Sequence, residues 1–269
     1  MKLKASVLSV LLCCFVFQIN AQNIETKTHT IKDVKSIAVD GNVDIHIKQG
    51  NSKTVKIEAT AKQHKQMQVK IKGNAVSVSC KEGKRMDKPV QVYLEVENLN
   101  ALAGSGGADV YFDNRIQTQT LNIALSGGSD LLGTIEADKF TCATSGGSDI
   151  DLKKVDVKEI QITSSGGSDV TVKEMSATKV SFVISGGSDV DVVGRCDDMT
   201  IIASGGSDFM GNRFKAKKSS IVVSGGSDAH IHVTEELSVI ASGSSDITCE
   251  GKPNIKDEKI GKGSDFMMK

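Results

Sequence analysis

The pentapeptide Ser-Gly-Gly-Ser-Asp recurs along this chain and constrains its fold more than any other feature. Identical copies begin at Ser126, Ser145, Ser165, Ser185, Ser204 and Ser224, and looser copies begin at Ser105, Ser242 and Gly261. The aspartates that end successive copies are 18 to 21 residues apart, from Asp109 to Asp265. A fixed period of about twenty residues predicts stacked structural units rather than one irregular globule.

Apolar and polar residues alternate on both sides of these pentapeptides. Val180, Phe182 and Ile184 precede the copy that ends at Asp189, and Val190 follows it. Such alternation places the apolar side chains on one face of a strand. We therefore predict an all-β fold, a parallel β-helix (a single-stranded solenoid) with two or three short strands and about 20 residues per coil. Neighbouring coils would pair in register at a spacing of about 4.8 Å. An antiparallel β-sandwich is the competing fold, but it does not explain why the corner residues recur.

The chain divides into three predicted regions. Residues 1–21 are expected to be a signal peptide, because Lys2 and Lys4 precede an apolar run and Ala21 ends it at cleavage spacing. Residues 22–103 are expected to form an N-terminal β region with irregular first coils that cap the stack. Residues 104–269 are expected to form the regular β-helix. The leader predicts export, to the periplasm, the outer membrane surface or the extracellular space.

The N-terminal β region lacks the pentapeptide but shows period-two patterns. Strands are expected at residues 37–39, 43–47, 54–59, 69–71, 75–80 and 90–96. Residues 22–30 are expected to be a polar lead-in, and no window has a sustained helical period.

Composition excludes several kinds of partner. The full chain carries 33 basic and 33 acidic residues, so no electrostatic argument supports binding to nucleic acid. No segment after the leader approaches eighteen apolar residues, so no transmembrane segment is expected in the mature chain.

Four cysteines follow the leader, at Cys80, Cys142, Cys196 and Cys249. They occupy different positions relative to the repeat, so they do not stack on one another. We expect separate buried thiols rather than a disulfide framework.

The repeated aspartates are the candidate site of the sequence. A structural corner is the preferred interpretation, because glycines permit tight turns and aspartate accepts hydrogen bonds from backbone N–H groups. The alternative is a Ca²⁺ ladder, since a row of carboxylates near hydroxyls and carbonyls is rich in oxygen ligands. Its ligands would be Asp130, Asp149, Asp169, Asp189, Asp208 and Asp228. No other cofactor is expected.

No motif in the sequence indicates catalysis, and no catalytic residue is predicted. His230 and His232 alternate onto one face of a strand without a visible third metal ligand, so surface histidines are favoured. His46 is expected to be an isolated surface residue. The repeat varies too little in length to hold the long loops that build a catalytic cleft on a β-helix.

Two stretches and the serial corners resemble the head GIN domain family. The stretches are Val39-Asp40-Gly41-Asn42-Val43-Asp44-Ile45-His46-Ile47-Lys48-Gln49-Gly50 and Asn98-Leu99-Asn100-Ala101-Leu102-Ala103-Gly104-Ser105-Gly106. Members are exported proteins of Bacteroidetes-type bacteria that carry the label of autotransporter adhesins. The resemblance implies a right-handed parallel β-helix and a location in the cell envelope, and it supplies no catalytic residues.

These observations predict a non-enzymatic, exported cell-envelope protein. It would act as an adhesin or binding scaffold that presents a repetitive β-helix surface to an envelope or extracellular glycan or protein. Two alternatives stay open at this stage. One is a carbohydrate-active enzyme that processes polysaccharide on the same fold, and the other is a purely structural spacer of the periplasm.

Overall fold

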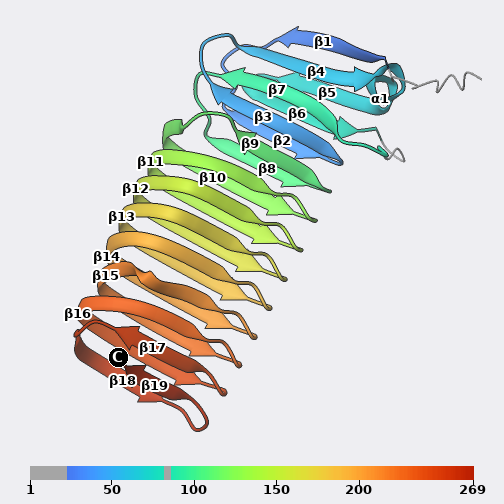
Figure 1. The fold of residues 1–269 in the computed structure, drawn as a ribbon. Coiled ribbons are helices and arrows are strands. Elements are labelled where there is room, and N and C mark those ends of the chain that lie inside the picture. Colours follow the sequence, from blue (N-terminus) through green and yellow to red (C-terminus); the bar gives the residue numbers. More distant parts are fainter. Residues whose placement is uncertain (1–22, 82–85) are drawn as a thin grey trace, which may run out of the picture.

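The computed structural model describes residues 23–81 and 86–269, which form one parallel β-solenoid with an antiparallel cap (Figure 1). The predicted signal peptide lies outside the described residues. Within the two described ranges, no helix has both the length and the apolar character that crossing a bilayer requires.

The regular part of the solenoid is built from long strands that pair in parallel with their neighbours. In chain order they are β10 (Ile116–Ser126), β11 (Leu131–Ser145), β12 (Ile150–Ser165), β13 (Val170–Ser185), β14 (Val190–Ser204), β15 (Phe209–Ser224) and β16 (Ala229–Ser242). They are followed by β17 (Asp246–Glu250), β18 (Asn254–Ile260) and β19 (Asp265–Met268). Ser126, Ser145 and Ser165 lie opposite one another in this register. The predicted parallel β-helix is confirmed.

Each coil differs from the prediction in one respect. Two or three short strands were expected, whereas β11 to β16 are each one continuous strand of 14 to 16 residues. The strand runs out from the tight Ser-Gly-Gly-Ser-Asp corner, turns through a broad bend at the opposite edge, and returns (Figure 1). Pairing continues through the bend, as between Glu136 and Asp156, because consecutive coils bend at the same place.

The N-terminal part has its own strands and the one helix of the described residues. They are β1 (Ile24–Thr30), β2 (Ser36–Asp40), β3 (Val43–Gln49), β4 (Thr54–Thr60), α1 (Ala61–Gln66), β5 (Met67–Lys72), β6 (Ala75–Cys80), β7 (Val90–Val96), β8 (Ala101–Ser105) and β9 (Ala108–Phe112). Strands β2 and β3 lie between β6 and β7 on one side and β8 and β9 on the other. Spatial order therefore departs from chain order here. Antiparallel strands complete the end, with β5 on β6, β4 on β7 and β1 on β4.

Two sequence expectations for this part were wrong. Residues 24–30, expected as a polar lead-in, form β1, because the edge of β4 offers them backbone partners along seven positions. A short helix, α1, was also missed. Thr60 and Gln63 form a capping box at its start, each side chain accepting a hydrogen bond from the other's backbone N–H. A helix of six residues is too short to show a helical period.

The core is a stack of apolar columns inside the coils. One column contains Leu131, Ile150, Val170, Val190, Phe209, Ala229 and Ile247, each no more than 2% exposed. Full burial of one large apolar side chain contributes roughly 1.5–3 kcal/mol. The columns therefore hold the coils together along the whole axis.

The cysteines lie in or against this core as separate thiols, as predicted. Cys142, Cys196 and Cys249 are buried, and Cys80 is half-buried. Burial raises the pKa of Cys142 well above its ordinary value and that of Cys196 to about 12. Both thiols therefore stay protonated at neutral pH.

The tight corner needs glycine for two separate reasons. Gly186 and Gly187 both have a positive φ, of 73° and 77°. A Cβ on Gly186 would also lie 3.1 Å from the backbone nitrogen of Gly166 in the preceding coil. The second position is more open. In the looser copy Ser244 occupies it with φ 63°, whereas Gly243 keeps the first position.

A buried serine ladder joins consecutive corners from Ala108 to Ser227. Ser168 N–H donates to Ser188 Oγ at 3.0 Å, and Ser188 N–H donates to Ser207 Oγ at 3.3 Å. Equivalent bonds link Ala108, Ser129 and Ser148. Ser188 is completely buried. The hydroxyl therefore satisfies a backbone donor that water cannot reach.

We predict that Ser188→Ala lowers the free energy of unfolding by about 1–3 kcal/mol, because it leaves the buried N–H of Ser168 without an acceptor. The matched control is Ser185→Ala in the same corner, where the serine is only half-buried, and its effect should stay within about 0.5 kcal/mol. Urea unfolding of both variants measures the difference. Equal stabilities would contradict a structural role for the ladder.

Candidate ligand-binding groove

The repeated aspartates form a column along the tight-corner edge of the solenoid. The Oδ1 atom of each carboxylate accepts the backbone N–H of the aspartate in the next coil, at 3.0 to 3.4 Å from Asp130 through Asp246. The predicted alignment of the corners is confirmed. Each carboxylate therefore carries out a backbone-capping task, which is the structural interpretation preferred from the sequence.

The Ca²⁺ ladder stays a prediction. Asp130, Asp149, Asp169, Asp189, Asp208 and Asp228 all lie in the column, but one oxygen of each already accepts a backbone hydrogen bond. In the part of the chain that the structure describes, no group of three or more His, Cys, Asp or Glu side chains is placed to hold a metal ion.

Asp109, in the looser first corner, has a carboxyl group with a raised pKa. Partial burial raises its pKa, and the neighbouring charges of Asp130 and Asp44 raise it further. The hydrogen bond from the Asp130 backbone opposes this shift but does not cancel it. The ionised form of Asp109 is thus disfavoured in the folded protein.

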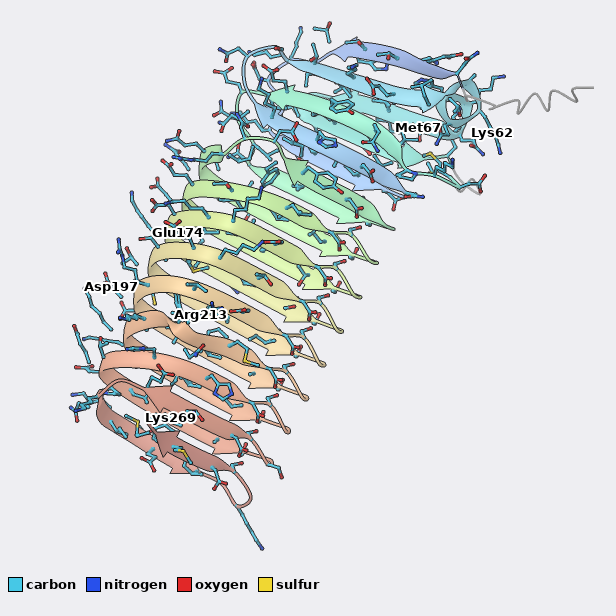
Figure 2. The ribbon with its side chains drawn as sticks, viewed as in Figure 1. Lys62, Met67, Glu174, Asp197, Arg213 and Lys269 are labelled. Carbon is cyan, nitrogen blue, oxygen red and sulfur yellow. The ribbon has the colours of Figure 1, made fainter. Side chains whose placement is uncertain are left out.

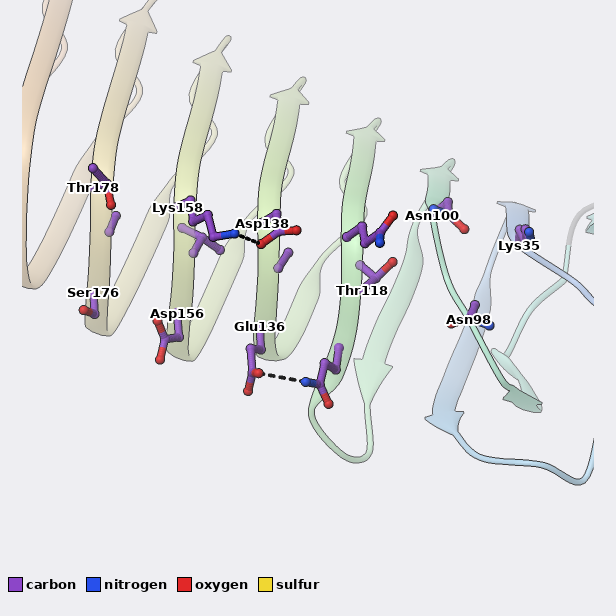
Figure 3. Close-up of a pocket in the computed structure, with 15 residues that line it drawn as sticks. Lys35, Asn98, Asn100, Thr118, Glu136, Asp138, Asp156, Lys158, Ser176 and Thr178 are labelled. Atoms are coloured by element: carbon purple, nitrogen blue, oxygen red, sulfur yellow. Dashed lines mark hydrogen bonds and ion pairs between the residues drawn. The ribbon is translucent and has the colours of Figure 1, made fainter.

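A large cavity lies at the opposite edge, along the broad bends of β10 to β13. It is an open groove of about 860 Å³ (Figure 3). Its floor consists of small or buried side chains in register, Thr118, Ala137, Val157 and Ala177. Asn98, Asn100 and Lys35 close the end toward the N-terminal part. Small floor residues let the backbone turn while leaving space above it.

Polar side chains from consecutive coils form the two walls of the groove. One wall contains Gln117, Glu136, Asp156 and Ser176, which lie opposite one another in register. The other wall contains Gln119, Asp138, Lys158 and Thr178. Amides, hydroxyls and charges thus alternate with a spacing of about one coil, 4.8 Å. This arrangement suits a polar ligand that lies along the solenoid axis.

The charges in the groove are partly neutralised. Glu136 accepts hydrogen bonds from Gln117 Nε2 at 2.9 Å and Arg115 Nη1 at 2.7 Å. Lys158 pairs with Asp138 at 2.7 Å (Figure 3). Asp156 forms no ion pair with another described residue and is exposed. Its carboxylate is therefore available to accept hydrogen bonds from a ligand.

Sequence reasoning missed this groove, although a signal was present. The groove residues lie at the same phase of each repeat, midway between two corners, but their identities differ from coil to coil. Figure 2 shows side chains projecting from this edge, including Glu174, Asp197 and Arg213. A search of the sequence for identical residues finds the corner. A ligand site made of different residues can be recognised only once the strand register shows which residues lie side by side.

The histidines have different environments from those expected. His46 is stacked between Tyr93 and Tyr111, with ring centroids 5.0 and 4.8 Å apart, and its Nδ1 lies 2.9 Å from Asp113 Oδ1. The expectation of an isolated residue was wrong, because β3 lies between β7 and β9. His230 and His232 are half-buried, and His232 Nδ1 lies 3.7 Å from Glu250.

Similar proteins provide a second line of evidence. A family model described as "Putative auto-transporter adhesin, head GIN domain" matches residues 33–153 and 143–253. No curated protein matches the sequence.

Solved structures share the fold at low sequence identity. A "putative adhesin" from Parabacteroides merdae ATCC 43184 has a TM-score of 0.72 and 18% identity, covering 93% of this chain and 97% of that one. A "putative adhesin" from Parabacteroides distasonis ATCC 8503 has a TM-score of 0.72 and 19% identity, with coverages of 93% and 98%. A "putative lipid binding protein" from the same strain gives 0.72 and 14%, with coverages of 93% and 98%. At these identities the likeness shows the fold alone.

We predict that millimolar Ca²⁺ leaves the melting temperature of the protein unchanged, because the column carboxylates already accept backbone hydrogen bonds. Thermal unfolding followed by circular dichroism, with and without Ca²⁺, checks this. A rise in melting temperature that grows with Ca²⁺ concentration, as mass action requires, would instead support the ladder.

We predict that Asp109→Asn raises the melting temperature at pH 7. The pKa of Asp109 is raised in the folded state, so the free energy of unfolding of the parent protein falls as pH rises above the ordinary value of 3.8. Asparagine cannot ionise and avoids this loss, while its Oδ1 can still accept a hydrogen bond. The advantage of the variant should therefore shrink toward pH 3. An advantage that is independent of pH would contradict the argument.

Proposed function

Because the chain belongs to the family described as "Putative auto-transporter adhesin, head GIN domain", we propose that it is an exported, non-enzymatic binding scaffold of the cell envelope. Its partner is a polar glycan or protein segment of the envelope or the extracellular space. The groove at the broad bends of β10 to β13 receives this partner.

The observation that carries the proposal is the groove itself. It is about 860 Å³ in volume, within the range of ligand sites, and it is lined by side chains from four consecutive coils. Its walls repeat hydrogen-bonding groups at the coil spacing. An extended chain with its own regular repeat could therefore make similar contacts to several coils at once.

The electrostatics of the groove support a weakly charged or partly basic ligand. Glu136, Asp138 and Asp156 contribute three carboxylates, whereas Lys35 and Lys158 contribute two ammonium groups. Asp138 and Lys158 neutralise each other. Strong attraction of a polyanion is not supported by this balance.

The walls support binding rather than turnover. The groove is open, and the coils that form it have no long loops, since the corners that bracket them recur every 19 to 21 residues. A carboxyl that acts as a general acid near neutral pH needs a raised pKa, which burial commonly provides. Asp156 lies exposed to solvent.

The test is binding of the purified full chain to a panel of neutral and charged polysaccharides, extracellular matrix proteins and envelope proteins. We expect at least one ligand to bind, and Asp156→Arg to weaken that binding by about tenfold or more, because it places a bulky cation on the groove wall. The matched control is Glu235→Arg, an exposed acid at the same edge but outside the groove.

Four outcomes would contradict the proposal. Equal losses in both variants would indicate a general charge effect, and no loss in either would place the partner elsewhere. Absence of binding to every ligand would favour the structural spacer. Release of oligosaccharides from any polysaccharide, abolished by Glu136→Gln, would favour the carbohydrate-active enzyme.

A further inference from the structure

In β8 and in β10 to β16, one face of the solenoid carries no charge, in a chain in which 25% of residues are charged. Charge returns on this face at its C-terminal end, in β18, where Lys259 follows Ile240 in register. This uncharged face is formed by the eight returning segments that lead into the tight corners. They are residues 101–105, 122–126, 141–145, 161–165, 181–185, 200–204, 220–224 and 238–242. None contains Asp, Glu, Lys, Arg or His. Surfaces of free monomers are normally rich in charge, so this face has the composition of an interface core.

The outward side chains of the uncharged face form three columns in register. A column of serines runs beside the corners, and a column of Asn, Thr, Gln and Ser runs nearer the broad bends. The middle column is apolar apart from one threonine. It reads Ala124, Ala143, Thr163, Val183, Ile202, Val222 and Ile240. Ile202 and Ile240 are 44% and 37% exposed.

The middle column is graded in size, and the gradient selects one way of pairing two such faces. Small side chains lie toward β10 and large ones toward β16. If two copies meet face to face with their axes antiparallel, small side chains meet large ones. Ala143 then faces Ile240 of the second copy, and Val183 faces Ile202. The gap between the sheets stays constant, as close packing at about 10 Å requires. Parallel axes would crowd one end and leave voids at the other.

A ladder of charges beside the uncharged face selects the same arrangement. One in-register column at the broad bends alternates in sign along Lys139, Glu159, Lys179, Asp198, Lys218 and Glu236. Within one chain its neighbours pair at 3.9 Å for Lys139–Glu159 and 3.6 Å for Lys218–Glu236. Antiparallel pairing about a two-fold axis between β13 and β14 places each basic residue opposite an acidic one. Lys179 then lies opposite Asp198 of the second copy.

The size of the uncharged face is sufficient for a specific dimer. About the proposed axis the six strands β11 to β16 face one another. From the charge ladder to the corner each strand contributes seven residues, and at about 3.3 Å per residue and about 4.8 Å per strand they cover about 670 Å² per copy. Two copies would bury about 1,300 Å², near the lower limit of stable protein–protein interfaces. Within the uncharged segments the pairing desolvates no ionised group, and the charges of the ladder lie at one edge of the contact.

We propose that two copies of this chain associate through the uncharged face, with antiparallel axes and a two-fold axis between β13 and β14. The contact is isologous, as expected for a two-fold dimer. It leaves the tight corners and the broad-bend grooves of both copies open, and it places the two grooves along the same edge of the dimer.

Analytical ultracentrifugation of the purified full chain over a range of concentrations tests the association. A species of twice the mass of one chain is expected. Ile202→Lys should weaken dimerisation by about 100-fold or more, because it buries two lysines near the two-fold axis without acidic partners. The matched control is Met210→Lys, which is 43% exposed on the opposite face and should leave the dimer intact. Circular dichroism verifies that both variants fold.

Cysteine cross-linking tests the direction. Treating a mixture of Ala143→Cys and Ile240→Cys chains with a short bifunctional thiol cross-linker should give a covalent dimer, whereas Ala143→Cys chains alone should give none. A linker is needed because sheets packed about 10 Å apart are too distant for a direct disulfide. Cross-linking of Ala143→Cys chains alone would indicate parallel axes and overturn the proposed arrangement. A monomer at all concentrations, a dimer insensitive to Ile202→Lys, or a monomer that binds neutral phospholipid vesicles through this face would overturn the dimer.

Discussion

The structure depends on one constraint, the in-register stacking of identical corners. A coil can pair with the next along its whole length only if both turn at the same residue and with the same backbone geometry. Gly186 provides the turn and allows the preceding coil to approach, since any Cβ there would lie 3.1 Å from the nitrogen of Gly166. The serine and aspartate ladders then satisfy the backbone N–H groups that this close approach removes from water.

The two ladders run in opposite directions along the axis. Each buried serine N–H donates to the hydroxyl of the following coil, whereas each aspartate carboxylate accepts the N–H of the following coil. The four corners that end at Asp149, Asp169, Asp189 and Asp208 are therefore tied to both neighbours by both residue types. Unit charges 4.8 Å apart in water repel by roughly 0.9 kcal/mol. The backbone donors offset this repulsion where they reach Oδ1. At Asp109 the pKa is raised, first by partial burial and then by the charges of Asp130 and Asp44.

The regular solenoid was predictable because the corner residues on which its stacking depends recur in the sequence. Period, corner and alternation all follow from the requirement that like residues stack. The N-terminal part was less predictable for the same reason. Strand β2 pairs with β6 on one side and with β8 on the other, so strands distant in the chain become neighbours. No local sequence pattern encodes such long-range pairing. The helix α1 rests on a two-residue capping box, and β1 becomes a strand only because β4 presents an open edge.

The groove and the uncharged face escaped sequence reasoning because their residues vary. Every corner must have the same backbone geometry as the corners of the two neighbouring coils, so its residue types are fixed. A broad bend or an outward face only has to preserve the backbone hydrogen bonds between coils. Ala143 and Ile240 occupy the same column without disturbing the backbone register of their strands. Side chains that bind a partner can therefore be substituted only at positions where stacking does not fix the residue type. Both proposed contact regions lie at such positions, away from the serine and aspartate ladders, so a partner could be exchanged in evolution without altering the fold that presents it.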